Sequence, residues 1–257
     1  MSRALIDLRA PEVAARLTES SVLLQPVGAV EQHGPHLPLS TDLVIATALA
    51  ETVVAAHGDA LDLWLLPPLA YTKSNEHAWA PGTIWLSPQT MLSVLDDLGR
   101  SLATLPANKL VFLNGHGGNS ALLAVANREL RLAHGLLTFL LHPSQPRDSG
   151  GAAHDHDELG MGVHAGRDET SVMLHLRPEL VDMSLAERSV PAALAGAEHV
   201  RFGGSTAFGW SSDDLAESGV IGDPTLASAE LGARLWDGML ATAAATLAEV
   251  AAFAFPR

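Results

Sequence analysis

Residue types that bind divalent metals recur in three separate segments, GAVEQHGPHLPLSTD (residues 28–42), NGHGGN (residues 114–119) and HAGRDETS (residues 164–171). Together these segments supply two imidazoles and three carboxylates: Glu31, His33, Asp42, His116 and Glu169. A mixed set of nitrogen and oxygen ligands suits Zn²⁺, Mn²⁺ or Fe²⁺ better than copper or Ca²⁺. The pattern therefore indicates a transition-metal site.

The number of carboxylates indicates two metal ions rather than one. A single catalytic zinc usually takes three protein ligands, whereas five ligands fit two ions when one carboxylate bridges them. Two ions about 3.5–4 Å apart can share an activated water, which is the chemistry of hydrolysis. Serine catalysis is not expected, because Ser74, Ser120 and Ser171 have no triad context.

The remaining histidines and two asparagines are open to structural interpretations. Asn114 and Asn119 could hold the glycine-rich loop around His116 or contact substrate. His36 and His77 are left open between site and structural roles, with His77 placed towards the rim of the site. For HDHD, which holds His154 and His156, a solvated loop is favoured over a metal site. Solvated or hydrogen-bonded positions are also expected for the others: His57, His134, His142, His175 and His199.

The elements that must position these residues alternate along the chain. Continuous apolar runs at residues 22–27, 61–66, 109–113 and 136–141 predict buried parallel strands. Helical patterns separate them: one at residues 42–57 after Thr41 as N-cap, one from Ser87-Pro88 to about residue 105, and one to residue 134 capped by Asn119 or Ser120. A helix of about 25 residues is expected to start at Asp223 or Thr225. This order predicts an α/β fold, a three-layer α/β/α arrangement with a mostly parallel central sheet.

Each metal-binding segment is expected at one edge of that sheet. In open α/β sheets, ligands lie beyond the carboxyl ends of the strands, and the first two segments directly follow predicted strands. Two stretches, residues 142–163 and 191–222, are longer than ordinary connections and are expected to be functional loops. No linker composition divides the chain, so a single domain is expected over residues 1–257.

Composition excludes several other classes of protein. The net charge of −14 repels phosphate backbones, so nucleic-acid binding is not expected. The chain has no cysteine, which excludes thiolate catalysis and cysteine-based zinc sites. The most apolar stretch, residues 239–255, is rich in alanine and carries Glu249, so we expect a buried or oligomer-facing helix rather than a membrane span. No targeting signal is evident, and a soluble cytoplasmic protein is expected.

Five segments resemble the creatininase (creatinine amidohydrolase) family, in the order in which the family has them. They are PVGAVEQHGPHLPLSTD (26–42), SNEHAWAPGTIWLS (74–87), FLNGHGGN (112–119), HAGRDETSVML (164–174) and GVIGDPTLASAELG (219–232). The resemblance implies an α/β/α fold, assembly as a homo-oligomer (usually a hexamer), and two divalent metals per chain, commonly zinc, manganese or iron.

The resemblance also implies roles for individual residues. Glu31, His33, Asp42 and His116 match metal ligands, with Asp42 as the bridge. Creatininase has a glutamate ligand where this chain has Gly118, and Glu169 resembles its replacement in relatives that share this form. His164 matches a histidine that acts in proton transfer. We assign four further residues to substrate binding: Ser74, His77, Asn114 and Asn119.

Three functions are compatible with this resemblance. The first is hydrolysis of a C–N bond in a small amide or cyclic amide by metal-activated water. An alternative is a peptidase of the mycofactocin-system type, which acts on the C-terminus of a precursor peptide and has a similar HAGR-x-ETS motif and a late GDP segment. A distant alternative is a non-catalytic binding protein on the same scaffold, which would need a damaged ligand set. Creatininase has side chains where this chain has Gly117 and Gly118, so a wider pocket with weak or no creatinine hydrolysis is expected.

Overall fold

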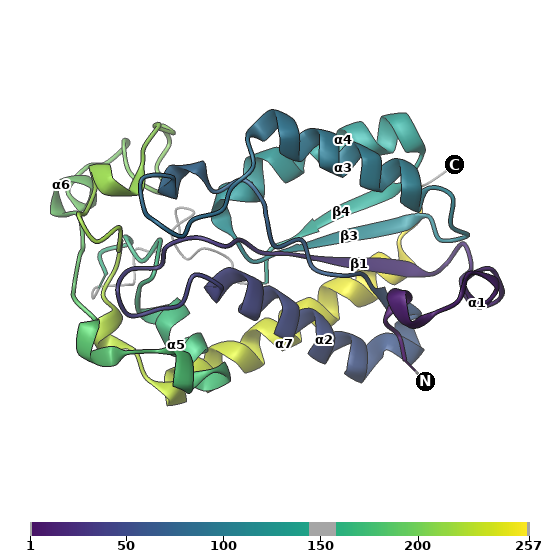
Figure 1. Cartoon of the computed structure of the whole chain (residues 1–257), viewed down its shortest axis with the longest axis horizontal. Helices are drawn as coiled ribbons and strands as arrows, with labels where there is room; N and C mark the ends of the chain where they lie inside the picture. The colour runs from purple at the N-terminus through teal and green to yellow at the C-terminus, as the bar shows by residue number, and fades with distance from the viewer. Residues whose placement is uncertain (1, 144–157, 256–257) are drawn as a thin grey trace.

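The computed structural model describes residues 2–143 and 158–255, so His154 and His156 lie outside the described residues. Its centre is a four-stranded sheet in the order β2-β1-β3-β4 (Figure 1). The strands are β1 (Val22–Val27), β2 (Leu63–Leu65), β3 (Lys109–Asn114) and β4 (Leu137–Leu141). Every neighbouring pair is parallel, with Val22 opposite both Leu63 and Lys109. The predicted parallel sheet is therefore confirmed.

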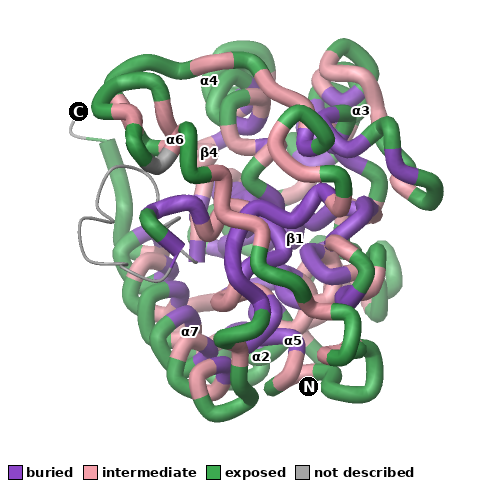
Figure 2. The backbone as a smooth tube through the Cα atoms, turned by 90° about the vertical axis from the view of Figure 1, so that its left-hand side faces the viewer, coloured by how far each residue is buried: buried purple, intermediate pink, exposed green. Residues whose placement is uncertain are grey.

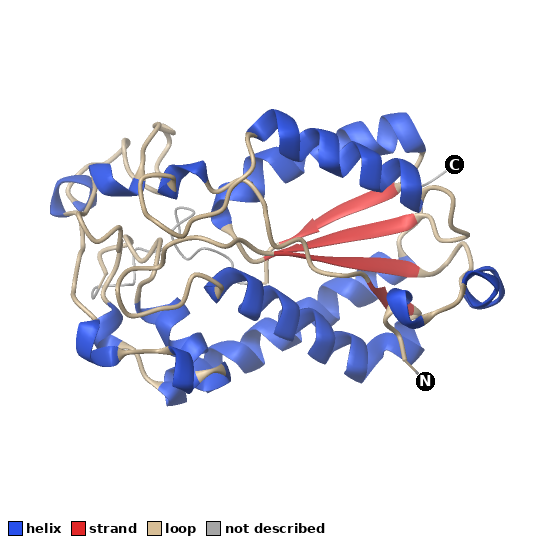
Figure 3. Cartoon of the chain, in the orientation of Figure 1, coloured by secondary structure: helices blue, strands red, loops and turns tan. Residues whose placement is uncertain are grey.

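Alternate residues of each strand face two separate hydrophobic cores, as the two-residue period of a strand requires. Val22 and Leu24 of β1 point into the core formed with α2 (Thr41–Leu61), α5 (Arg167–Leu176) and α7 (Ala229–Ala252). Leu23 points into the opposite core, formed with α3 (Pro88–Leu102) and α4 (Ser120–His134). Helices thus cover both faces of the sheet (Figure 3), which confirms the three-layer α/β/α architecture.

Shorter elements complete the described chain. Two are brief helices, α1 (Ala10–Arg16) and α6 (Ala192–Ala195). The others are 3₁₀ turns: Leu5–Asp7, Asn75–His77, Gly117–Asn119, Pro178–Leu180, Met183–Leu185, Ser212–Asp214 and Pro224–Leu226. Figure 2 shows that the central strand β1 is buried along its length, whereas the outer helices expose one side.

Several predicted element ends were wrong. Helix α2 begins at Thr41, with Ser40 as its N-cap, and the Thr41 hydroxyl donates to the Pro38 carbonyl instead of capping. Asp223 caps only a three-residue 3₁₀ turn by accepting from the Thr225 amide. The long C-terminal helix starts later, where Ser228 accepts from the Leu231 amide. The predicted cap at Ser87 is confirmed, since its hydroxyl accepts from the Thr90 amide.

Helix α2 is the one helix among the described residues that is long and apolar enough to cross a membrane, judged by length and composition. Its apolar residues have a different explanation in this fold, because Ile45, Leu49 and Val53 are buried in the core against the sheet and α7. The apolar stretch at residues 239–255 belongs mostly to α7, where Met239 and Leu247 are buried in the same core.

A glycine lets the start of α2 approach the end of β1. A Cβ atom at Gly28 would lie 2.5 Å from the Cα atom of Leu43, so only glycine permits this contact. The close approach brings the first turn of α2, with Asp42, to the carboxyl end of the sheet.

Candidate metal centre

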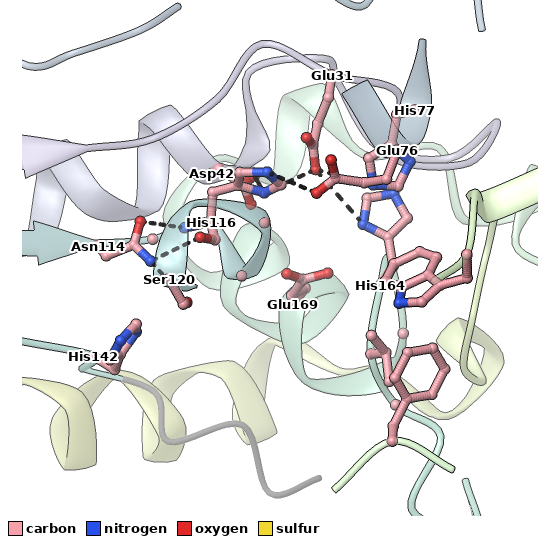
Figure 4. A pocket seen from close by; sticks show the side chains of 18 of the residues that line it. Glu31, Asp42, Glu76, His77, Asn114, His116, Ser120, His142, His164 and Glu169 are labelled. Atoms are coloured by element: carbon pink, nitrogen blue, oxygen red, sulfur yellow. Dashed lines mark hydrogen bonds and ion pairs between the residues drawn. The ribbon is translucent and has the colours of Figure 1, made fainter. Parts of the chain in front are cut away.

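The predicted ligands lie beyond the carboxyl ends of the strands, and Figure 4 shows four of them, Glu31, Asp42, His116 and Glu169, around one cavity. Glu31 and His33 follow β1, and Asp42 lies in the first turn of α2. His116 follows β3, and Glu169 lies in the first turn of α5. Glu169 is half-buried and the other four side chains are buried.

Asp42 lies between two imidazoles. Its Oδ1 is 3.2 Å from Nε2 of His33, and its Oδ2 is 3.1 Å from Nδ1 of His116. Oε1 of Glu31 is 3.2 Å from the same nitrogen of His116. The carboxylate of Asp42 therefore lies between His33 on one side and the pair of His116 and Glu31 on the other.

The donor atoms fit divalent cations. Three trios each place one ligand atom per residue within 4.8 Å of the others: Glu31, Asp42 and His116; His33, His164 and Glu169; and Glu31, His77 and His164. Within the described part of the chain, both carboxylate oxygens of Glu31, Nε2 of His33 and Oδ2 of Asp42 are buried and make no hydrogen bond of acceptable geometry, although three of these atoms have an oppositely charged group 3.1–3.2 Å away. Buried polar atoms are normally hydrogen-bonded, so a cluster of unpaired donor atoms matches the ligand shell of metal ions.

The electrostatics of the cluster agree with this interpretation. Burial raises the pKa of Glu31 and of Glu169 to about 7. Burial opposes protonation of His33, but the Asp42 carboxylate raises its pKa to about 10. Buried carboxylates keep their charge only where cations compensate it. In the protein alone that compensation comes from protons on the histidines, and divalent ions would supply it instead.

His164 is held as a neutral imidazole beside the cluster. Burial and the nearby His33 lower the pKa of His164 well below its usual value. Its Nε2 donates to the Gln32 carbonyl at 2.8 Å, which leaves Nδ1 unprotonated and 3.8 Å from Oε1 of Glu31. The ring also stacks on His77, with 4.1 Å between the ring centroids. A fixed neutral imidazole can accept a proton, and its free nitrogen could equally bind a metal.

A cavity of about 590 Å³ opens on the cluster. Glu31, Asp42, His116, His164 and Glu169 line it on one side. Another part of its wall comes from the long segment 191–222, through three aromatic residues: Phe202, Phe208 and Trp210. The prediction that this segment takes part in the site is consistent with that placement, whereas most of the other predicted loop, residues 144–157, lies outside the described residues.

Comparison with known proteins identifies the family. The Creatininase family, described as creatinine amidohydrolase, matches residues 7–247. This chain belongs to the creatininase family. It is 40% identical over 225 residues to a mycofactocin precursor peptide peptidase of Mycobacterium ulcerans (strain Agy99), covering 85% of this chain and 81% of that protein.

Two further relatives place the chain within the same family. A creatinine amidohydrolase of Pseudomonas putida is 34% identical over 203 residues, which cover 72% of this chain and 76% of that protein. The solved structure "Creatininase Mn" superposes with a TM-score of 0.73 at 26% identity and covers 97% of this chain and 98% of that chain. The chain is thus a creatininase-family hydrolase, from a metal-dependent family, with candidate metal-ligand groups of its own.

Of the four residues assigned to substrate binding, two line the cavity of this creatininase-family fold and two do not. His77 and Asn114 line the cavity. Ser74 and Asn119 are buried, and neither is among the described residues that line it. The Asn119 amide donates to the Gly28 carbonyl and the Thr72 hydroxyl, and its oxygen accepts from the Lys73 amide. Of the two roles left open for Asn119, holding the loops is the one that these contacts support.

Sequence reasoning left out Gln32, Lys73 and Glu76. The Gln32 side-chain amide donates to Nδ1 of His77 at 2.9 Å, and the Gln32 backbone carbonyl accepts from Nε2 of His164 at 2.8 Å, so Gln32 contacts both rings. Oε1 of Glu76 is 3.4 Å from Nε2 of His116. Each of the three lies within two residues of a predicted site residue. This proximity in the sequence is the feature that could have identified them.

Two other histidines have defined positions. His142, expected to be solvated or hydrogen-bonded, is half-buried and lines the cavity beyond the end of β4 (Figure 4). His36, left open between roles, is buried with its Nε2 3.0 Å from the Thr170 hydroxyl, and is not among the described residues of the cavity wall.

Proposed function

We propose that this chain is a dinuclear metal-dependent hydrolase that cleaves an amide bond at the end of a peptide. The observation that carries this proposal is the cluster of buried, unpartnered carboxylate and imidazole atoms beside a cavity of about 590 Å³. Pockets for ligands of drug size span about 300–1,000 Å³, so the cavity has room for more than one small ring. The similarity to the mycofactocin precursor peptide peptidase supports the same substrate class.

The ligand set divides into two groups that share Asp42. Glu31, Asp42 and His116, which form one candidate trio, would hold one ion. His33 and Glu169, which share another trio, would hold the second ion together with Asp42, which contacts His33. Zn²⁺, Mn²⁺ or Fe²⁺ are the ions suited to these donors. When bound, such ions lower the pKa of a coordinated water towards about 7 and polarise a carbonyl oxygen.

His164 is the proposed general acid and base. Its Nε2–H is held by the Gln32 carbonyl, and its free Nδ1 faces the cluster. Nδ1 would accept the proton released by the attacking water and return it to the leaving nitrogen of the amide. Stacking on His77 keeps the ring in this orientation.

A small cyclic amide is the second candidate substrate. The similarity to the creatinine amidohydrolase of Pseudomonas putida favours it. Against it, no described residue other than the chain neighbours of Gly117 lies within 4 Å of a Cβ atom built there, and Gly117 itself has no side chain to pack against a small flat ring.

A substrate screen on metal-loaded protein tests the choice between these substrates. Short peptides with different C-termini and creatinine would be incubated in parallel, and the products identified by mass spectrometry. We expect cleavage near a peptide C-terminus, and turnover of creatinine with no turnover of any peptide would contradict the proposal.

The proposal extends to the assembly of the protein. The chain acts as one catalytic domain and forms a homo-oligomer, a hexamer by resemblance to its family, in the cytoplasm. Light scattering coupled to size exclusion checks the assembly against the chain mass of 26.9 kDa. A monomeric mass at working concentrations would contradict it.

A further inference from the structure

A side chain from a different loop occupies the space beside Gly118. A Cβ atom built at Gly118 would lie 1.8 Å from Oε1 of Glu76 and 2.4 Å from Nε2 of His116. Glu76 belongs to the 3₁₀ turn Asn75–His77, which follows β2, whereas Gly118 follows β3. The Glu76 carboxylate thus fills the place where a side chain at position 118 would begin, so the glycine and the glutamate are sterically coupled.

Glu76 contacts His116 on the edge of the ring that faces away from the candidate ligands. Nδ1 of His116 lies 3.2 Å from Glu31 and 3.1 Å from Asp42. Nε2, on the other edge, lies 3.4 Å from Oε1 of Glu76 and 3.0 Å from the carbonyl of Lys73. Since a carbonyl only accepts, Nε2 carries the proton on this edge. A histidine that binds a metal usually gives its second ring N–H to such a partner, which fixes the orientation of the ring.

The Glu76 side chain is itself held in place. It is buried, and its Oε2 is 2.5 Å from Nζ of Lys73. The Lys73 amide donates to Asn119, in the loop that carries His116. The hydroxyl of Ser211 donates to the Glu76 carbonyl at 3.1 Å. These contacts tie the Glu76 loop both to the loop after β3 and to the segment beyond Trp210.

We propose that Glu76 is a positioning residue of the metal centre, which orients His116 so that its Nδ1 faces Glu31 and Asp42. Lys73 supports it by pairing with the second carboxylate oxygen and by offering its own carbonyl to the same ring edge. This inference rests on the proposed function, because it takes Nδ1 of His116 as a ligand atom. It assigns a role to a residue that is not itself a ligand, and it explains why Gly118 lacks a side chain.

The test is the affinity for Zn²⁺ of Glu76→Ala and Glu76→Gln, measured by competition with a chromophoric chelator. Loss of such a partner typically weakens metal binding by about 10–100-fold, and we expect a loss in this range for Glu76→Ala. Glu76→Gln keeps an acceptor oxygen and the side-chain size, so it should lose less. Glu129→Gln, on the exposed side of α4, is the matched control and should bind Zn²⁺ like the wild type.

A second readout separates positioning from a general effect on folding. In the Co²⁺-loaded protein, the visible absorption bands should change in both Glu76 variants and stay unchanged in the Glu129→Gln control. The melting temperature of metal-free Glu76→Gln should stay close to that of the metal-free wild type.

The possible failures are distinguishable. A wild-type protein that binds no Zn²⁺ would contradict the proposed function itself. Wild-type zinc affinity and an unchanged Co²⁺ spectrum in both Glu76 variants would overturn the inference alone. If Glu76→Ala does not fold, the zinc affinity and the Co²⁺ spectrum of Glu76→Gln test the inference instead. Wild-type values of both in Glu76→Gln would overturn it.

Discussion

Asp42 contacts two histidines of the site at once. Each of its oxygens faces a different imidazole, His33 at 3.2 Å and His116 at 3.1 Å. Burial opposes ionisation of Asp42, but these two imidazoles hold its pKa well below the usual value. A carboxylate placed between two imidazoles in this way is the geometry expected of a bridging ligand.

Asp42→Asn should therefore reduce the metal content from two ions per chain towards one or none. The amide has the same shape but lacks the negative charge that two adjacent cations require. His116→Ala, which removes one ligand of one proposed ion, should leave the other site partly filled. Elemental analysis of the purified variants checks both expectations, and two ions retained in Asp42→Asn would place the bridge elsewhere.

His164→Ala should affect turnover more than metal content. General acid–base groups typically contribute about 10²–10⁴-fold to rate, and we expect a loss in that range with the metal stoichiometry preserved. The control is His199→Ala, an exposed histidine outside the cavity wall. Because His164 is also part of two candidate ligand trios, loss of metal in His164→Ala would reassign it as a ligand.

Among the secondary-structure elements, the strands were easier to predict from the sequence than the ends of the helices. Continuous apolar runs predicted all four strands, since buried parallel strands are apolar on both faces. Helix ends were harder, because Asp223 and Ser228 both form caps and only tertiary packing decides which one starts α7.

The same distinction applies to the site. Four of its five proposed ligands, Glu31, His33, Asp42 and His116, could be predicted because they lie in the loops after β1 and β3 or in the helical turn that follows. Glu169, in the first turn of α5, was predicted from its motif instead. The roles of Glu76 and Gln32 were not, because each acts on a ring that is remote in sequence, as Glu76 does on His116. Such contacts depend on how loops pack against one another, and no periodicity or spacing records that packing.

The junction between α2 and β2 offers a test at this scale. Asp62 ends α2 in a left-handed conformation (φ 50°) and accepts hydrogen bonds from Ser21, Arg3 and Trp64. Burial acts to raise the pKa of Asp62, but the Ser21 hydroxyl and the Arg3 guanidinium lower it overall. The charged form of Asp62 therefore favours the folded state.

Asp62→Asn should lower the free energy of unfolding by about 1 kcal/mol at neutral pH, the usual net worth of such hydrogen bonds. Because the folded-state pKa is depressed, this stabilisation is present above the unfolded pKa of about 3.9 and is lost as the pH falls below it. Urea unfolding at pH 7 and at about pH 3 checks this. The exposed Asp59→Asn should have little effect, and an equal loss for Asp62→Asn at both pH values would contradict the charge argument.

In the whole molecule, the hydrophobic cores and the cavity occupy different places. Two cores on opposite faces of the sheet hold the strands, and the cavity lies beyond their carboxyl ends, bounded by long loops. Apart from Val220, the segment 191–222 contributes no residue to either core, so we expect it to influence which substrate fits. The aromatic wall from Phe202, Phe208 and Trp210 belongs to such a loop.

Creatinine should be a poor substrate despite the name of the family. Gly117 offers no side chain to a small ring, and each lost packing or hydrogen-bond contact costs about 1–3 kcal/mol in discrimination. We expect weak or no hydrolysis in a steady-state assay with metal-loaded protein. A kcat/KM above about 10⁴ M⁻¹s⁻¹ would show that the long loops rebuild the missing contacts.

Removal and return of the metal ions tests directly whether hydrolysis depends on them. A peptide that the protein cleaves would be assayed before chelation, after chelation to a metal-free state verified by elemental analysis, and after addition of Zn²⁺, Mn²⁺ or Fe²⁺. We expect hydrolysis to disappear with the metal and to return with at least one of these ions. Full activity in verified metal-free protein would contradict it.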